Sequence, residues 1–338
     1  MKNIWIYTLC IIALFACTKN DSFDSYEGEG YEHKLHISAS LTSFKENTQS
    51  KLSPDSIYKH DSDKGFADNS RIGICTYRSG RFDAIKINAY KSDLKAENIL
   101  SVKKNDQWTN QSDIYLREPA NVYAYYPYTD VNFIPGNTNN PAITSDDESP
   151  SLYIFPGQTD YLYGKAEKKG SWLLDIITPL CNNANIKFRH AMALITILIK
   201  NESGTEQQLS RITLNNITAK AKLNISNGAI TATEDQPVTI NFPEYQSGKY
   251  NNLTTTTINS LGTGKSDKMA LPRFQTFAIP MVLTGSNTVS LTLNGSIKEC
   301  SLNTEDSGIW ESGKAYFYTI RIDKNDIISV ESIQQSRL

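Results

Sequence analysis

The sequence predicts an all-β protein with two globular domains. A chain of 338 residues is long enough for two domains of about 150 residues each, and its 39% hydrophobic content can supply a core for both. Eighteen tyrosines, Asn/Thr/Ser-rich stretches and short apolar runs at regular intervals are typical of an extracellular β-protein. No segment longer than a few turns carries a convincing apolar stripe with a 3.6-residue period, so a helical or α/β enzyme is not expected.

The charge balance does not indicate a polyanionic partner. The formal net charge is -2, from 34 basic and 36 acidic residues, which produces no strong field of either sign. Binding to nucleic acid or to an anionic membrane surface is therefore not expected.

The N-terminus has the pattern of a bacterial lipoprotein signal peptide. Lys2 supplies a positive start, Ile4–Phe15 is apolar, and Ala16 is a small residue directly before Cys17. Residues 1–16 would be removed and Cys17 would become the lipidated first residue, holding the exported protein to a membrane by acyl chains such as palmitate. An ordinary signal peptide or a single N-terminal anchor helix are the alternatives. Residues 17–32 are polar and are expected to form a flexible tether.

Three cysteines remain after Cys10 is assigned to the signal peptide and Cys17 to the lipid. Cys75, Cys181 and Cys300 are an odd number, lie far apart and include no C-x-x-C motif. This pattern argues against a disulfide framework or a zinc site, although one pair could still oxidise. Buried free thiols are favoured.

The first expected strand runs from His33 to Phe44 because apolar and polar residues alternate there with period two. Four side chains would point inward, and their neighbours His36, Ser38, Ser40 and Thr42 would point outward. The inward set is Leu35, Ile37, Ala39 and Leu41. A linker follows over residues 45–70, where Pro54, Gly65 and many polar residues make packing unlikely.

The rest of the first half consists of short strands separated by turns. Arg71–Tyr77 and Arg81–Ile87 flank Ser79-Gly80 and are expected to form a hairpin. Residues 131–150 form a Pro/Gly/Asn/Asp loop, and residues 168–185 cross to the second half. Further strands are expected at 98–103, 107–109, 114–116, 121–128 and 152–155.

The stretch Ile186–Lys200 is the most apolar run outside the N-terminus, and we expect one central strand covered on both faces. It is too short to span a membrane as a helix and is rich in β-branched residues. We take it to open the second domain, which gives domains at 33–183 and 184–338. Later strands are expected at 209–214, 221–225, 229–233, 238–242, 274–283, 288–293, 298–302, 315–322 and 327–333.

Four stretches, in order behind the lipoprotein motif, together resemble the Bacteroidetes fimbrillin family, whose members are lipoprotein-derived subunits of type V pili. They are R-I-G-I-C-T-Y from Arg71, Y-A-Y-Y-P-Y from Tyr123, F-R-H-A-M-A-L-I from Phe188 and W-E-S-G-K-A-Y-F-Y-T-I from Trp310. The resemblance implies two tandem transthyretin-like β-sandwich domains, with Phe188 onward opening the second. It also implies a location at the cell outer membrane or surface, in a fimbrium.

The resemblance further implies a mode of assembly with other pilus subunits. A protease would remove the first strand of the lipidated precursor, and a strand from another subunit would fill the vacated groove, which is β-augmentation in physical terms. His33–Phe44 fits the removable strand, since it alternates, is N-terminal and precedes a loose linker. The incoming strand would be the C-terminal Ile327–Ile333 or another terminal segment.

One departure from the family leaves the processing site open. Family members are processed at Arg, yet no Arg lies between Cys17 and Arg71, and the linker offers only Lys45, Lys51, Lys59 and Lys64 before it. Either Arg71 is the site, or a protease of different specificity acts, or the subunit stays lipidated as an anchor.

We expect no catalytic site, cofactor or metal. Gly262-Thr263-Gly264-Lys265-Ser266 resembles the end of a phosphate-binding loop, but Asn259 stands where its first Gly belongs and no strand-to-helix context surrounds it. His33, His36, His60 and His190 lack the spacing of zinc ligands, and no G-x-S-x-G or Cys-His motif occurs. An enzyme would require a site assembled from distant loops.

Four tyrosines are the remaining candidates for ligand binding. Tyr123, Tyr125, Tyr161 and Tyr163 could stack sugar rings if exposed, although strand tyrosines more often cover the edges of a sandwich. The alternative function is therefore a monomeric surface lipoprotein that binds a glycan or a host protein.

Overall fold

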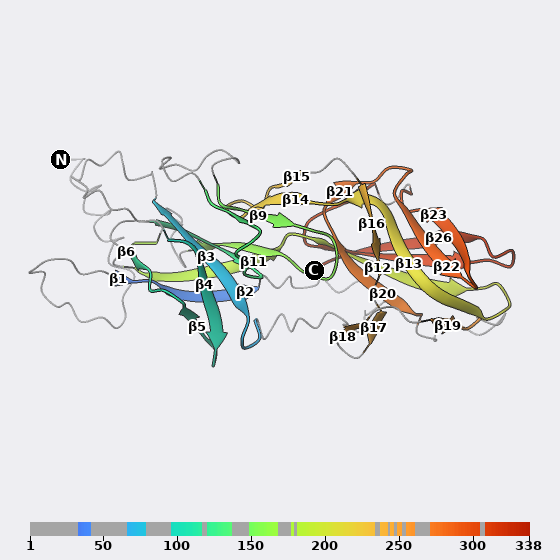
Figure 1. The fold of residues 1–338 in the computed structure, drawn as a ribbon, viewed down its shortest axis with the longest axis horizontal. Helices are drawn as coiled ribbons and strands as arrows, with labels where there is room; N and C mark the ends of the chain where they lie inside the picture. The colour runs from blue at the N-terminus through green and yellow to red at the C-terminus, as the bar shows by residue number, and fades with distance from the viewer. Residues whose placement is uncertain are drawn as a thin grey trace, which may run out of the picture.

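A computed structural model describes the fold over most of the chain, including residues 33–41 and 66–78 near the N-terminus. The remaining described residues are 96–116, 120–136, 149–167, 177–178, 181–233, 237–242, 244–246, 249–251, 255–260, 271–304 and 308–338. These residues form strands and connecting turns, with no helix among them (Figure 1). Within these ranges, therefore, no helix is long and apolar enough to cross a membrane. The all-β class expected from the sequence is confirmed.

The N-terminal half is built on one seven-stranded sheet, drawn from blue to green in Figure 1. Its two edge strands, β2 (His36–Leu41) and β5 (Gln107–Asn110), lie close together, so the sheet curls around its own core. The strand order is β2, β11 (Asn183–His190), β10 (Leu162–Glu167), β7 (Ala120–Tyr126), β3 (Arg71–Arg78), β4 (Ala96–Lys104) and β5. A short pair, β1 (His33–Lys34) with β6 (Tyr115–Leu116), lies beside it.

The curled sheet encloses the N-terminal core, which Leu35, Leu41, Phe66, Ile72, Ile74, Leu116, Val122, Ile186 and Phe188 build with their neighbours. Period-two alternation places these residues on one face of each strand; in β11, for example, Ala184, Ile186 and Phe188 are buried and Lys187 and Arg189 are exposed.

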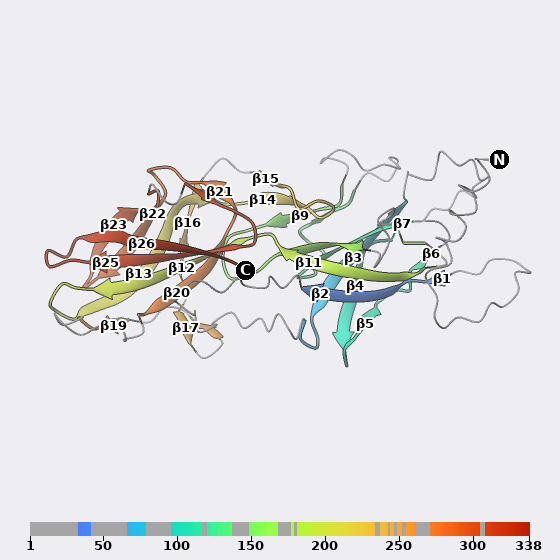
Figure 2. The same ribbon diagram turned by 180° about the vertical axis from the view of Figure 1, so that it is seen from behind.

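The C-terminal half stacks two larger sheets, as the view from behind in Figure 2 shows. One has the order β18 (Lys249–Asn251), β17 (Glu244–Gln246), β20 (Arg273–Ala278), β12 (Ala193–Asn201), β25 (Lys314–Ile322) and β26 (Ile328–Arg337). The other has the order β16 (Pro237–Asn241), β13 (Gln207–Thr218), β22 (Thr288–Leu293) and β23 (Ser296–Ser301), with β19 (Thr256–Ile258) also on β13. A short pair joins β21 (Met281–Val282) to β24 (Ile309–Trp310). Ile195, Ile197 and Ile199 of β12 meet Ile212 and Leu214 of β13 in the C-terminal core.

A small four-stranded sheet joins the two halves. β8 (Phe133–Ile134) and β9 (Ser151–Ile154) come from the first half, and β14 (Ala221–Asn224) and β15 (Ile230–Ala232) from the second. Beneath it, a junction core combines Tyr123 and Tyr125 with Leu152, Leu223 and Phe277. The halves are therefore connected by packing as well as by the chain.

The apolar stretch Ile186–Lys200 forms two strands, which corrects the expectation of one. Residues up to His190 belong to β11 of the N-terminal sheet, and β12 begins at Ala193 in a C-terminal sheet. Only β12 is buried on both faces, because the outer face of β11 presents Lys187 and Arg189. The chain changes sheets at Ala191 and Met192. A domain boundary drawn by sheet membership would lie there rather than between residues 183 and 184, and the division into domains stays a prediction.

Cys75 is buried and Cys181 and Cys300 are half-buried, and none of these three cysteines is in a disulfide. The strand expected at 327–333 is longer and runs from Ile328 to Arg337. The signal peptide, Cys17, the tether, Arg81–Ile87 and Gly262–Ser266 lie outside the described residues.

Candidate assembly site: the N-terminal strand and its groove

The N-terminal strand lies at the edge of the seven-stranded sheet with one ladder partner. β2 pairs in parallel with β11, from His36 opposite Asn183 to Leu41 opposite Phe188. Its side chains alternate as the sequence predicts: His36, Ser38 and Ser40 are exposed. The inward positions are unequal, however, because Leu35 and Leu41 are 2% and 9% exposed whereas Ile37 and Ala39 are only partly buried.

Polar contacts also join this segment to the sheet, among them a hydrogen bond of 2.7 Å from the Asn182 side-chain amide to the Lys34 carbonyl and one from the Ser38 hydroxyl to the Asn185 side chain. The Leu35 amide donates to the Ile114 carbonyl over 2.7 Å, and the His36 amide donates to the Asn182 carbonyl over 2.9 Å. Lys34 and Asp113 form an ion pair of 2.7 Å, but both side chains are more than 40% exposed, so it adds little stability. The segment is therefore held mainly by its ladder and by the burial of Leu35 and Leu41.

An aromatic cluster lies at the end of β2, beside the ladder partner of its last residue. The Phe66 ring packs edge-on against Trp108, Tyr126 and Phe188, with centroids 5.4, 5.6 and 5.0 Å away. Phe188 is also the residue opposite Leu41. Phe66 is 7% exposed although it lies in the linker, so the expectation that the linker is unlikely to pack is wrong at this residue. Residues 67–69 are exposed. The one signal of Phe66 in the sequence was a large aromatic side chain in a polar segment.

Arg71, the residue at which processing was considered, begins an inner strand of the same sheet. Its side chain is exposed and its guanidinium lies 5.4 Å from the centre of the Tyr128 ring. Its carbonyl accepts a hydrogen bond of 3.0 Å from the Tyr128 amide, and it lies opposite Val102 in the ladder. The next residue, Ile72, is fully buried. The bond between Arg71 and Ile72 is thus fixed on both sides in the folded chain.

The C-terminal strand β26 also has one ladder partner. It pairs antiparallel with β25, from Lys314 opposite Arg337 to Ile322 opposite Ile328, with an irregularity between Thr319 and Ile320. Most of its side chains are exposed or half-buried; Ile328 is the buried one. β26 is therefore an edge strand, as β2 is, but in the C-terminal sheet that contains β12 and β25.

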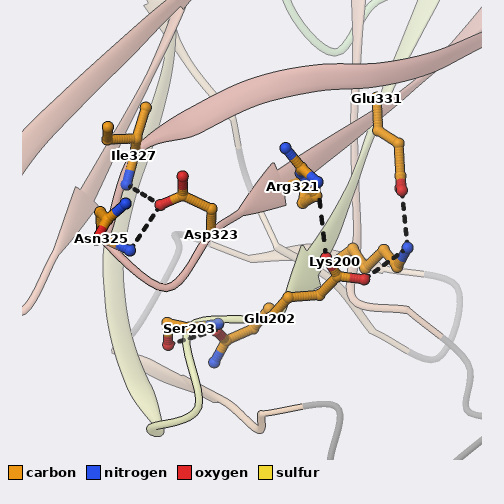
Figure 3. A network of polar contacts seen from close by, with 9 residues as sticks. Lys200, Glu202, Ser203, Arg321, Asp323, Asn325, Ile327 and Glu331 are labelled. Atoms are coloured by element: carbon orange, nitrogen blue, oxygen red, sulfur yellow. Dashed lines mark hydrogen bonds and ion pairs between the residues drawn. The ribbon is translucent and has the colours of Figure 1, made fainter. Parts of the chain in front are cut away.

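A polar network surrounds the start of β26 (Figure 3). The Lys200 ammonium lies 2.8 Å from both Glu202 and Glu331, and these hydrogen bonds raise the pKa of Lys200. In the turn before β26, the Asp323 carboxylate accepts the amides of Asn325 and Ile327 over 2.8 and 2.9 Å, which lowers the pKa of Asp323. These contacts fix where the last strand begins.

His190 is a hydrogen-bonded histidine at the end of β11. Its Nδ1 lies 2.8 Å from Oδ2 of Asp160, and both side chains are largely buried. Burial lowers the pKa of His190, but the charge of Asp160 and the hydrogen bond to it outweigh burial, and the pKa is raised above its ordinary value. The pair lies beside the crossover between the two halves, since the Ala191 amide bonds to the Tyr161 carbonyl over 2.8 Å.

The four tyrosines considered for sugar stacking do not form an exposed platform. Tyr123, Tyr125 and Tyr161 are 6%, 0% and 8% exposed, because the junction core covers them. Tyr163 is half-buried against the turn at Gly228. Within the described part of the chain, no three His, Cys, Asp or Glu residues gather in a group that could hold a metal ion.

Comparison with known families identifies the chain. The model of the fimbrillin-like family matches residues 60–333, which is most of the sequence and both halves of the fold. The chain belongs to the fimbrillin-like family. The matched residues begin close to Phe66 and end within β26. A search of curated proteins finds no match.

Several solved structures share the fold of this chain. A candidate cell adhesion protein from Bacteroides uniformis is similar with a TM-score of 0.54 at 14% identity, over 91% of this chain and 99% of that one. One from Bacteroides ovatus gives the same values. A fimbrial protein from Bacteroides vulgatus gives a TM-score of 0.53 at 13% identity, over 90% and 99% of the two chains. At such identities the likeness shows the fold alone.

Proposed function

We propose that this protein is a structural subunit of a cell-surface pilus, exported as a lipoprotein and assembled by trimming and strand exchange. Membership of the fimbrillin-like family supports the pilus role, and the solved relatives named as fimbrial or cell adhesion proteins support a part in adhesion. The position of β2 is the observation that supports strand exchange. β2 is an edge strand with one parallel neighbour, and a long linker separates it from the next strand of the sheet.

Loss of the N-terminal strand would uncover an apolar groove. Leu35 and Leu41 are the large side chains that it buries, and burial of each contributes about 1.5 to 3 kcal/mol, so the strand contributes on the order of 3 to 6 kcal/mol before ladder bonds. A domain's whole stability is about 5 to 15 kcal/mol. A trimmed subunit would therefore be metastable until another strand fills the groove, and the filling would drive assembly without a nucleotide.

The incoming strand supplies ladder bonds to β11 and inward side chains at alternate positions. β26 is a candidate because it is ten residues long and paired on one side only. Another terminal segment remains the alternative. In either case the partner is a pilus subunit, and Cys17 holds the precursor to the outer membrane before processing.

The test is assembly of purified protein after proteolytic trimming. Trimmed protein should form filaments by electron microscopy and ladders that resist boiling on gels, whereas untrimmed protein, the matched control, should stay monomeric. Trimmed protein that remains monomeric would contradict the proposal and favour a monomeric surface binder.

A further inference from the structure

Phe66 packs in the N-terminal core although it precedes Arg71, the residue considered for processing. Its edge-on contacts reach β5, β7 and β11 through Trp108, Tyr126 and Phe188. Each of these three strands has a ladder partner other than β2, since β5 pairs with β4, β7 pairs with β3 and β10, and β11 pairs with β10. The three ring contacts of Phe66 therefore involve no residue of β2.

The segment after Phe66 is fastened to β4 by a second, independent set of contacts. The Lys103 ammonium donates to the Phe66 carbonyl over 2.5 Å, and it also pairs with Asp106 at 3.1 Å. The Asn69 amide donates to the Lys103 carbonyl over 2.9 Å, and the Lys103 amide donates to the Ser70 carbonyl over 3.0 Å. The Lys103 side chain is 11% exposed, so water competes little for its hydrogen bond to the Phe66 carbonyl. Asp106 is 95% exposed, and its ion pair with Lys103 therefore adds little.

We propose that residues 66–71 stay bound when the N-terminal strand leaves, and that Phe66 forms the closed end of the strand-binding groove. This inference rests on the strand exchange proposed above. A protease binds its substrate as an unpaired extended chain, and the Arg71–Ile72 bond is not available in that form while its ladder is intact. Phe66 then positions the end of any strand in the groove, at the place where Leu41 now lies opposite Phe188.

Limited digestion of the full-length folded protein with trypsin tests this retention. Trypsin cuts after Lys and Arg, so the first residue of the stable product, read by mass spectrometry, reports whether the Arg71–Ile72 bond is protected. The wild-type product should retain Phe66. In Phe66→Ala the rate of cleavage after Arg71 should rise about tenfold or more, because local opening becomes more frequent. Ala67→Ser, at an exposed neighbour, should match the wild type.

A double-mutant cycle tests the groove end even if Phe66→Ala is poorly stable, with Phe66→Leu as the milder variant. Leu41→Ala and Phe66→Leu should lower the melting temperature less together than the sum of their separate effects, because both side chains belong to the same apolar cluster as Phe188. Additive effects, or a wild-type product that begins at Ile72, would overturn the inference. Filament formation is measured separately from the first residue of the product. Trimmed protein that begins at Ile72 and still polymerises contradicts only this inference. Trimmed protein that retains Phe66 but does not polymerise contradicts only the proposed strand exchange.

Discussion

Leu35 illustrates how a single buried side chain holds the N-terminal strand. It is 2% exposed and its amide bonds to Ile114. Leu35→Ala in the full-length protein should lower the free energy of unfolding by about 2 to 5 kcal/mol through lost burial and a residual cavity. The matched control, Ser40→Ala on the exposed face of β2, should change it by less than about 0.5 kcal/mol. Equal shifts in chemical denaturation of the two variants would contradict the assigned inward face.

His190 predicts a pH dependence of stability with a definite sign. Its pKa in the folded protein is raised above the ordinary value, since the pull of Asp160 exceeds the effect of burial. A raised pKa stabilises the fold fully below the ordinary pKa, about 6.5, and this contribution is lost as pH rises through the folded-state value. Tyr126 also lies near Asp160, and burial followed by the Asp160 charge raises its pKa, so it stays neutral in this range.

The measurement compares thermal melts of the wild type and His190→Gln between pH 5 and pH 8. The stability of the wild type should fall relative to that of the variant as pH rises. A difference between the two proteins that does not change with pH would contradict a charged His190–Asp160 pair.

At the scale of elements, the turn of the β14–β15 hairpin packs against the N-terminal sheet. Gly228, in that turn, has a φ of +80°, and a Cβ there would lie 2.0 to 2.4 Å from atoms of the Tyr163 ring of β10. No other residue type combines that backbone conformation with such a close approach. The turn therefore fixes how the hairpin lies on the N-terminal sheet.

Gly228→Ala should lower the free energy of unfolding by about 1 to 3 kcal/mol, from the backbone strain and the clash together. Gly295→Ala is the matched control, because its φ of +81° is the same within a degree but nothing lies within 4 Å of the added Cβ. The difference between the two variants in thermal melts measures the clash with Tyr163. If the melting temperatures of both variants fell equally, the hairpin turn would not pack against Tyr163.

At the scale of the whole molecule, the proposed route to the surface depends on Cys17. Cys17→Ala should abolish lipidation and leave the precursor in the inner membrane or periplasm, since no thiol would remain at the lipidation position to accept the acyl chains. Labelling of cells with a palmitate analogue checks this directly, and the wild type is the control. Equal incorporation of label by the variant would remove the lipoprotein assignment.

The sequence by itself determined the all-β class, the alternating N-terminal strand and the fimbrillin resemblance. These features depend on local patterns: period-two alternation from Leu35 to Leu41, short apolar runs, and motifs such as the one from Phe188. The alternating pattern did not show which inward side chains of the strand are fully buried and which are only partly buried. Ile37 is as apolar as Leu35, but it lies where the edge of the sheet covers it less.

Only the tertiary structure decided which sheets the strands join and which residues meet. Ile186–Lys200 looks like one strand because an apolar run does not reveal a change of sheet. The change occurs at Ala191–Met192 because β11 pairs with β10, whereas β12 pairs with β25, which lies more than a hundred residues further along the chain. The contacts of Phe66, and the burial of Tyr123 and Tyr125 in the junction core, are likewise non-local. Local sequence carries the period of a strand, but long-range packing selects its neighbours.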